Sequence, residues 1–354
     1  MKSKARWMVA LAVMAGVCWN GAMNSMANDY EAQLKAAAAA RAKDPAWKPS
    51  CQEVDLIQIG DKKKPGTLRN FCLNAEGNIL ACFGKAIRVY SPKGELLKTL
   101  PLEIQAGAIC VAKDGSIFAA GDGRVLKLNA DGKVLASAVS PVASEPVTIT
   151  KEIEEMLKQS GRPIKEERER MLTSLEKRRT DVAGLAATEQ DVFMAVGAPS
   201  DFTYRVYRFN HALENPKLVV EKLRGCCGQM NIQSHADNLW IPHNARHQVE
   251  SRDRDGKELA KFGKAGRVKP SDFGGCCEPK CMRVLPNGEI LAAESGPPTC
   301  IKRFSATGKF IEVIAAVETK GDCVRVTVEM SPDGKRYYLL DTTRDAIRVF
   351  AAKG

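Results

Sequence analysis

The sequence predicts an all-β fold, a six-bladed β-propeller that carries an inserted helical hairpin and an N-terminal helix. Three observations support this fold class. A pattern of short strands and tight turns recurs six times, most of its copies are about 40–50 residues apart, and the last copy is one strand short. Repeats of this length that are built from strands alone are typical of propeller blades.

Two polar turns mark each repeat. The first turns are AEGN (75–78), KDGS (113–116), PNGE (286–289) and PDGK (332–335); the second are PKGE (92–95), ADGK (130–133), RDGK (254–257) and ATGK (306–309). Glycine supplies the positive φ that tight hairpin turns need. The strands between the turns are rich in β-branched and aromatic residues, as in IRVYS (87–91) and IRVFA (347–351). Two weaker copies, at 188–210 and 235–256, complete the six.

The ends of the chain predict how the ring closes. The last repeat stops after three strands, and a lone apolar strand at 54–60 precedes the first full repeat. We expect this N-terminal strand to supply the missing outer strand of the sixth blade, because closure leaves no open edge.

Helical segments interrupt and precede the strands. First-turn positions Gly115 and Gln190 are 75 residues apart, which marks an insertion. Residues 150–180 contain two helical patterns, with Thr150 as a cap of the first and Pro163 at the start of the second. We expect a helical hairpin there, between the second and third blades. We expect residues 28–50 to form a separate helix or a tether.

The repeats resemble those of a known family. Strand–turn–strand blades that end in RVY or RVF, clearest over 67–136 and 278–350, are similar to NHL-repeat six-bladed propellers, which lie near the gluconolactonase and senescence-marker propellers in shape. The resemblance covers about residues 51–352. It implies a propeller domain over 51–354. It also implies either a docking ring for a protein or RNA or, as in a few such families, a metal-dependent lyase.

The N-terminus predicts export. Residues 1–27 combine Lys2, Lys4 and Arg6 with a short apolar run and small residues before a cleavage point, as in a signal peptide. Loss of these three cations would take the net charge from +11 to +8. We expect a periplasmic or secreted monomer with no membrane span. We expect no nucleic-acid partner either, because no basic-aromatic motif is present.

Cysteine placement singles out one face of the ring. Export would remove Cys18 and leave 11 of the 12 cysteines. Adjacent pairs occur in GCCG (225–228) and GGCCEPKC (274–281). By their place in the repeat, eight cysteines map to the face where the inner strand of each blade begins: Cys82, Cys226, Cys227, Cys276, Cys277, Cys281, Cys300 and Cys323. Cys72 and Cys110 occupy matching inner-strand positions, and we expect both to be buried core residues.

Three interpretations of the paired cysteines stay open. The cysteines could form bridges between adjacent loops, strained disulfides between neighbouring residues, or a metal site. The metal candidates are Cys226, Cys227, Cys276 and Cys277 with His243, and the candidate ion is divalent or soft: Zn, Cu or Ca. The spacing C-C-x3-C differs from the paired C-x2-C of zinc sites, so this zinc signal is weak.

Other polar residues map to the same face. These are His243, Glu294, Asp341, Arg325 and Arg283. The two arginines could meet an anion, whereas a carboxylate at a strand end commonly caps the next turn. From these features we expect a non-enzymatic exported binding module, with a Cys-rich face for a ligand or for a protein or polysaccharide partner. The alternatives are a metal-dependent hydrolase or lyase of the gluconolactonase-like kind, and a thiol- or metal-handling protein.

Overall fold

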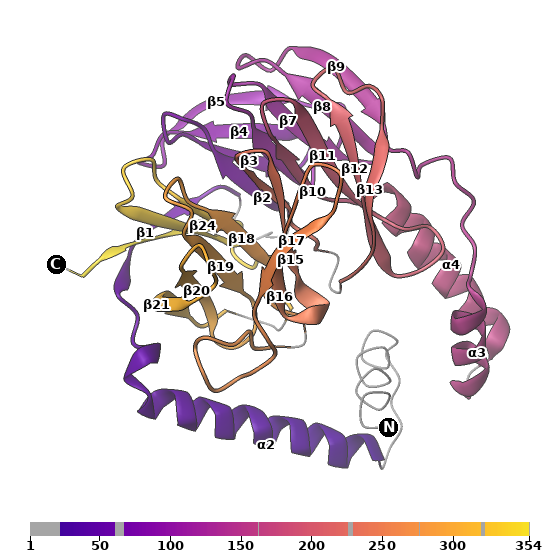
Figure 1. Ribbon diagram of the computed structural model, residues 1–354, viewed down its shortest axis with the longest axis vertical. Helices are drawn as coiled ribbons and strands as arrows, with labels where there is room; N and C mark the ends of the chain where they lie inside the picture. The colour runs from indigo at the N-terminus through magenta and orange to yellow at the C-terminus, as the bar shows by residue number, and fades with distance from the viewer. Residues whose placement is uncertain are drawn as a thin grey trace.

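The computed structural model describes residues 22–60, 67–161, 163–225, 229–275, 277–319 and 323–353, with side chains from residue 31 onward. The described strands form six four-stranded antiparallel sheets arranged around a central axis (Figure 1). The described residues also form three α-helices outside this ring: α2 (Ala22–Lys43), α3 (Lys151–Gln159) and α4 (Ile164–Thr180). No helix in the described part of the chain is long and apolar enough to cross a membrane.

Within each blade, the strands run outward from the axis in chain order, except that the outermost strand of the sixth blade comes from the start of the propeller sequence. The first three blades comprise β2 (Leu68–Leu73), β3 (Ile79–Phe83), β4 (Ala86–Tyr90) and β5 (Leu96–Pro101); β6 (Ala108–Val111), β7 (Ile117–Gly121), β8 (Arg124–Leu128) and β9 (Val134–Val139); and β10 (Val182–Ala187), β11 (Asp191–Gly197), β12 (Thr203–Asn210) and β13 (Lys217–Arg224).

The other three blades follow the same plan. They comprise β14 (Gln233–His235), β15 (Asn238–His243), β16 (Gln248–Arg252) and β17 (Glu258–Phe262); β18 (Cys281–Val284), β19 (Ile290–Glu294), β20 (Thr299–Phe304) and β21 (Phe310–Val317); and β22 (Val328–Met330), β23 (Arg336–Asp341) and β24 (Ala346–Ala352) with β1 (Cys51–Gln58). Below, the end of the ring where the inner strands begin is the loop face, and the end where they turn into the second strands is the turn face.

The expected ring closure is confirmed. Strand β1 pairs antiparallel with β24, in a register that runs from Cys51 opposite Ala352 to Gln58 opposite Ala346. An Arg348–Glu53 ion pair at 2.6 Å joins the two strands. The two ends of the propeller therefore hold each other in one blade, and the ring has no open seam.

The turns explain both the strong repeats and the weak third one. Gly256 has a φ of +88°, and a Cβ there would lie 1.8 Å from the carbonyl oxygen of Val219, so this turn requires glycine. The third blade has no glycine at its first turn. There the Thr188 hydroxyl accepts hydrogen bonds from the backbone N–H groups of Gln190 and Asp191 at 3.3 and 3.0 Å. A side-chain acceptor thus replaces glycine as the turn-forming element.

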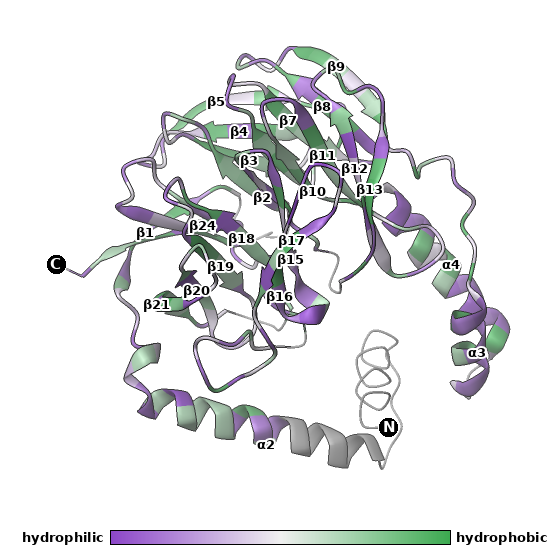
Figure 2. Ribbon diagram, in the orientation of Figure 1, coloured by the Kyte–Doolittle hydropathy of each residue, from purple (hydrophilic) through white to green (hydrophobic). Residues whose placement is uncertain are grey.

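The core is divided among the blades. Six clusters of buried apolar residues lie one between each pair of neighbouring blades. The apolar residues lie along the strands of the ring, while α3 and α4 are more polar (Figure 2). Helix α4 packs beside β11 through the fully buried Leu175, and an ion pair at 3.6 Å links Arg168 of α4 to Glu154 of α3.

Candidate functional site: the axial cavity

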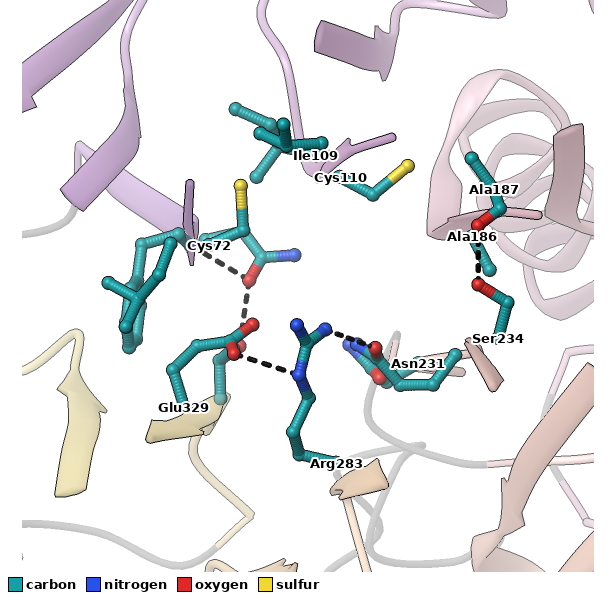
Figure 3. Close-up of a pocket in the computed structure, with 15 residues that line it drawn as sticks. Cys72, Ile109, Cys110, Ala186, Ala187, Asn231, Ser234, Arg283 and Glu329 are labelled. Atoms are coloured by element: carbon teal, nitrogen blue, oxygen red, sulfur yellow. Dashed lines mark hydrogen bonds and ion pairs between the residues drawn. The ribbon is translucent and has the colours of Figure 1, made fainter. Parts of the chain in front are cut away.

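The inner strands of all six blades surround a cavity of about 170 Å³ on the ring axis. Figure 3 shows that its side chains come from every blade. The polar lining residues are Asn70, Cys72, Cys110, Asn231, Gln233, Ser234, Arg283, Thr327 and Glu329. A cavity of this size has room for water or a small ligand only.

Side chains from different blades meet across the axis on the loop-face side of the cavity. Gln229, which precedes β14, donates to the carbonyl oxygen of Val326 at 2.6 Å and accepts from the Val326 N–H at 3.2 Å. Arg325 donates to the carbonyl oxygen of Gly107 at 3.1 Å. These contacts link the starts of the fourth, sixth and second blades across the axis, so they form an axial plug.

The lining becomes more exposed toward the turn face. The lining residues nearest the plug are buried: Asn70, Asn231 and Thr327. Those later in their strands are partly exposed: Gln233, Ser234 and Arg283. The partly exposed lining residues thus lie toward the turn face, opposite to the face on which the cysteines map, and we infer that the cavity opens there.

Arg283 organises the polar groups of the cavity. Its Nε lies 3.1 Å from Glu329 Oε2, and its Nη1 donates to Gln233 Oε1 at 2.7 Å. Elsewhere in the lining, Thr327 donates to Asn70 Oδ1 at 2.7 Å. One cation and one anion therefore face each other in a ring of amides and hydroxyls, and three blades are linked through Arg283.

Burial sets the protonation of the groups around Arg283. Desolvation raises the pKa of Glu329, and the nearby charge of Arg283 opposes this effect. Burial also raises the pKa of the Cys110 thiol to about 12 and that of Cys72 well above its usual value. The two thiols are therefore protonated and weakly nucleophilic at neutral pH. Asn231 Oδ1 is buried and has no hydrogen-bond partner among the described residues.

Several predicted face cysteines lie inside the blades. Cys82, Cys281 and Cys300 are at most 1% exposed and are free thiols. Cys277 is also buried, but its thiol is not free, and Cys323 is partly exposed. Burial raises the pKa of Cys281 to about 12 and raises that of Cys300 further. The thiols of Cys82, Cys281 and Cys300 are thus packed inside the blades and are not accessible to solvent. Cys226, Cys227 and Cys276 lie outside the described residues.

His243 holds the start of the loop that contains GCCG. Its Nδ1 lies 2.6 Å from Glu250 Oε1, and its Nε2 accepts a hydrogen bond from the Arg224 N–H at 3.1 Å. The imidazole is therefore the neutral tautomer with its proton on Nδ1. A metal ion at Nε2 would have to displace the Arg224 N–H.

Glu294 belongs to a buried charged cluster in the fifth blade. It forms an ion pair with Lys302 and accepts from the Gly274 N–H at 2.6 Å. Lys302 also donates to the carbonyl oxygen of Asp272 at 2.7 Å, and its Nζ lies 4.8 Å from the centre of the Trp47 ring. Burial raises the pKa of the neighbouring Glu278 to about 8. Sequence reasoning did not single out Glu278 or Lys302.

Asp341 caps a turn, as carboxylates at strand ends commonly do. It accepts hydrogen bonds from the N–H and hydroxyl of Thr343 at 3.1 and 2.6 Å. Arg325 lies in the axial plug and Arg283 in the cavity, so both predicted anion candidates reach the axis. Their roles toward a ligand stay predictions.

The described residues at the axis do not form a set of ligands for a metal ion. Among the described residues, Glu329 is the only carboxylate that lines the cavity, and Arg283 already pairs with it. No three His, Cys, Asp or Glu groups in the described part of the chain lie close enough together to hold an ion. The cavity therefore does not fit the divalent ion that the gluconolactonase-like alternative would need there. The predicted cysteine site involves residues outside the described set and stays a prediction.

Sequence reasoning missed most of the cavity lining. Asn70, Asn231, Gln233, Thr327 and Glu329 all lie shortly before the first turn of their repeat. Polar residues at these inner-strand positions are the signal that could have found them, since an apolar residue is the usual choice on a buried strand.

Comparisons with known proteins identify the fold. No protein-family model and no curated protein matches the chain. Among solved structures, a streptogramin B lyase is 10% identical with a TM-score of 0.53, and covers 88% of this chain and 100% of its own. A protein of unknown function from Bacteroides thetaiotaomicron is 11% identical with a TM-score of 0.56, at 87% and 73% coverage.

A gluconolactonase from Xanthomonas campestris is similar to the same extent. It is 11% identical, with a TM-score of 0.51, and covers 88% of this chain and 99% of its own. At such identities the likeness concerns the fold alone. Together with the six four-stranded sheets and the closure through β1, it shows that this chain is a six-bladed β-propeller.

Proposed function

We propose that this protein is an exported binding module whose axial cavity receives a small polar ligand. The observation that carries the proposal is a cavity with unused hydrogen-bonding capacity, namely the buried Asn231 Oδ1 beside an Arg283–Glu329 pair. A buried acceptor without a partner is costly, and a bound water or ligand would relieve that cost. Conversion of a substrate would need further groups at the axis.

The positions of the other polar candidates support binding over metal-dependent hydrolysis. His243, Glu294 and Asp341 are the polar residues, besides the two arginines, that the sequence maps to the loop face and that could bind an ion. Each instead has a partner elsewhere: Glu250, Lys302 and Thr343 respectively. Positively charged lysine and arginine side chains near Glu294 and Asp341 weaken the binding of a metal cation by these two carboxylates.

We further propose that the loop face is a docking surface for a protein or polysaccharide partner. The mapping of cysteine-containing loops to this face and the position of α3 and α4, between the second and third blades, support the proposal. The axial plug separates this surface from the cavity, so the two sites would bind independently.

A cavity-filling variant tests the main proposal. Ala187 lines the cavity from the third blade, so Ala187→Leu would fill it; the exposed Ala260 on β17 offers Ala260→Leu as a matched control. Small polar compounds would be screened by saturation-transfer NMR against the exported protein. We expect compounds whose signal survives in Ala260→Leu and disappears in Ala187→Leu. If no compound shows that pattern, the cavity is not a ligand site.

A thiol–disulfide function is a second candidate. Cys277 favours it, because its thiol is not free whereas Cys51, Cys72, Cys82, Cys110, Cys281 and Cys300 are free thiols. Mass spectrometry of unreduced peptides, with reduction at graded potentials, tests it. A Cys277 disulfide that resists reduction would make the bond a structural staple and would contradict a redox role.

A further inference from the structure

The guanidinium group of Arg283 has one terminal nitrogen left for a ligand. Its Nε is used by Glu329 and its Nη1 by Gln233, while Nη2 has no partner among the described residues. Figure 3 shows Arg283 between Glu329 and Asn231, with a terminal nitrogen directed into the open centre of the cavity. This nitrogen can donate to a carboxylate oxygen.

A second polar group without a partner, on the neighbouring fourth blade, requires a ligand group of the opposite kind. Asn231 Oδ1 is buried and accepts no hydrogen bond from the described residues. An amide oxygen is an acceptor only, so a ligand must meet it with an N–H or O–H group. The cavity thus presents a charged donor and a neutral acceptor to the same small molecule.

Charge balance narrows the ligand class. Among the lining residues the formal charges are those of Arg283 and Glu329, which cancel. A simple carboxylate would add a buried negative charge, and a simple amine would add a positive one, each at a considerable cost. A ligand with one charge of each sign adds no net charge, and each of its ends finds an oppositely polarised group.

We propose that the axial cavity binds a small α-amino acid as its zwitterion, which enters from the turn face, with the carboxylate on Arg283 Nη2 and the ammonium on Asn231 Oδ1. This rests on the proposed function as a binding module and adds the ligand class. A cavity of about 170 Å³ restricts the side chain to that of a small residue such as glycine or alanine. The thiols of Cys72 and Cys110, protonated at neutral pH, provide a neutral wall.

Equilibrium dialysis with radiolabelled glycine tests the proposal. Acetate and methylammonium, which each carry one half of the zwitterion, serve as competitors at equal concentration. We expect glycine to bind and neither half to compete effectively, because each half leaves one buried charge uncompensated. Competition by acetate as strong as by unlabelled glycine would overturn the zwitterion assignment.

Two variants locate the site. Arg283→Gln and Asn231→Leu should each weaken glycine binding roughly 10-fold or more, since each removes a hydrogen bond to a charged group. Arg124→Gln, which removes an exposed arginine of β8, should leave binding unchanged. Ala187→Leu should abolish binding without touching the Arg283 pair, which covers the case in which Arg283→Gln fails to fold. Unchanged affinity in Ala187→Leu would contradict the cavity as the site.

The outcomes separate this inference from the proposed function. If glycine does not bind but another compound binds and is lost in Ala187→Leu, the amino-acid assignment is wrong and the binding module stands. If no compound binds in the cavity, both are wrong.

Discussion

At the scale of single residues, buried charges govern how this protein responds to pH. Glu278 and Glu250 are both buried, yet their pKa values move in opposite directions. Burial dominates at Glu278 and raises its pKa to about 8, although Glu278 Oε1 accepts from the N–H and hydroxyl of Ser295. At Glu250, burial alone would raise the pKa, but hydrogen bonds from His243 and Arg252 outweigh it and lower the pKa to about 2.

Glu278→Gln should remove a pH dependence of stability. The folded state keeps a proton on Glu278 up to about pH 8, whereas the unfolded chain loses it near its ordinary pKa of 4.5. The native state thus binds more protons in this window, and its free energy of unfolding falls as the pH rises from about 4.5 to 8. Urea unfolding at pH 5 and pH 8 should show a smaller loss for the variant. An identical loss in both proteins would show that Glu278 ionises normally.

His243→Leu should destabilise the fourth blade. It removes one partner of the buried Glu250 and leaves the Arg224 N–H without its acceptor. We expect the free energy of unfolding to fall by about 1–3 kcal/mol. His235→Leu, at a partly exposed position on β14, is the control and should change stability by less than about 0.5 kcal/mol. Equal effects of the two substitutions would contradict a special role for His243.

At the scale of single elements, β1 and the helices contribute differently to the ring. Strand β1 is essential to closure, because it completes the sixth blade and places Ile57 in the core between the sixth and first blades. The C-terminal half of α4 is tied to the third blade through Leu175, and Arg178 donates to the Tyr204 hydroxyl at 3.3 Å. Helix α3 and the start of α4 lie farther out (Figure 1).

Two substitutions within β1 distinguish packing from strand pairing. Ile57→Ala should lower the free energy of unfolding by about 2–4 kcal/mol, because it leaves a cavity at the closing seam. Val54→Ala, at an exposed position of the same strand, should cost less than about 1 kcal/mol. Chemical denaturation of both variants checks this. Similar losses would mean that β1 contributes only its backbone hydrogen bonds.

Replacing residues 151–170 with a short Gly/Ser linker should leave the propeller folded. This deletion keeps Leu175 and Arg178, so the contacts of α4 with the third blade survive. We expect an unchanged cooperative thermal transition and altered binding of a partner at the loop face. Loss of the cooperative transition would show that the helices belong to the core.

At the scale of the whole molecule, the six wedge-shaped cores meet at an axis that apolar side chains do not fill. The axial plug and the cavity occupy that space, and both link blades that are distant in the chain. Gln229 and Val326, for example, are 97 residues apart and exchange two hydrogen bonds. Gln229→Ala should therefore leave two buried backbone groups unpaired and lower the free energy of unfolding by about 1–3 kcal/mol. Hydrogen exchange at the Val326 N–H should become faster, and an unchanged rate would contradict the plug.

The sequence by itself determined the architecture of this protein. Glycine turns, strand periodicity and the truncated last repeat are local features, and they led to six blades and to closure through the N-terminal strand. Where glycine was absent, as at Thr188–Asp191, the repeat was still visible because the strands kept their apolar pattern. Local rules suffice here because each blade is a contiguous stretch of chain.

Only the tertiary structure determined which polar side chains come together. The sequence pointed mainly to the cysteines of the loop face. The cavity combines Asn70, Asn231, Arg283 and Glu329 from four blades, and of these the sequence singled out Arg283 alone. No local pattern shows which inner-strand side chains converge on an axis, because convergence depends on how the blades close into a ring. Burial, which is equally non-local, placed three of the cysteines in blade interiors and set the opposite pKa shifts of Glu278 and Glu250.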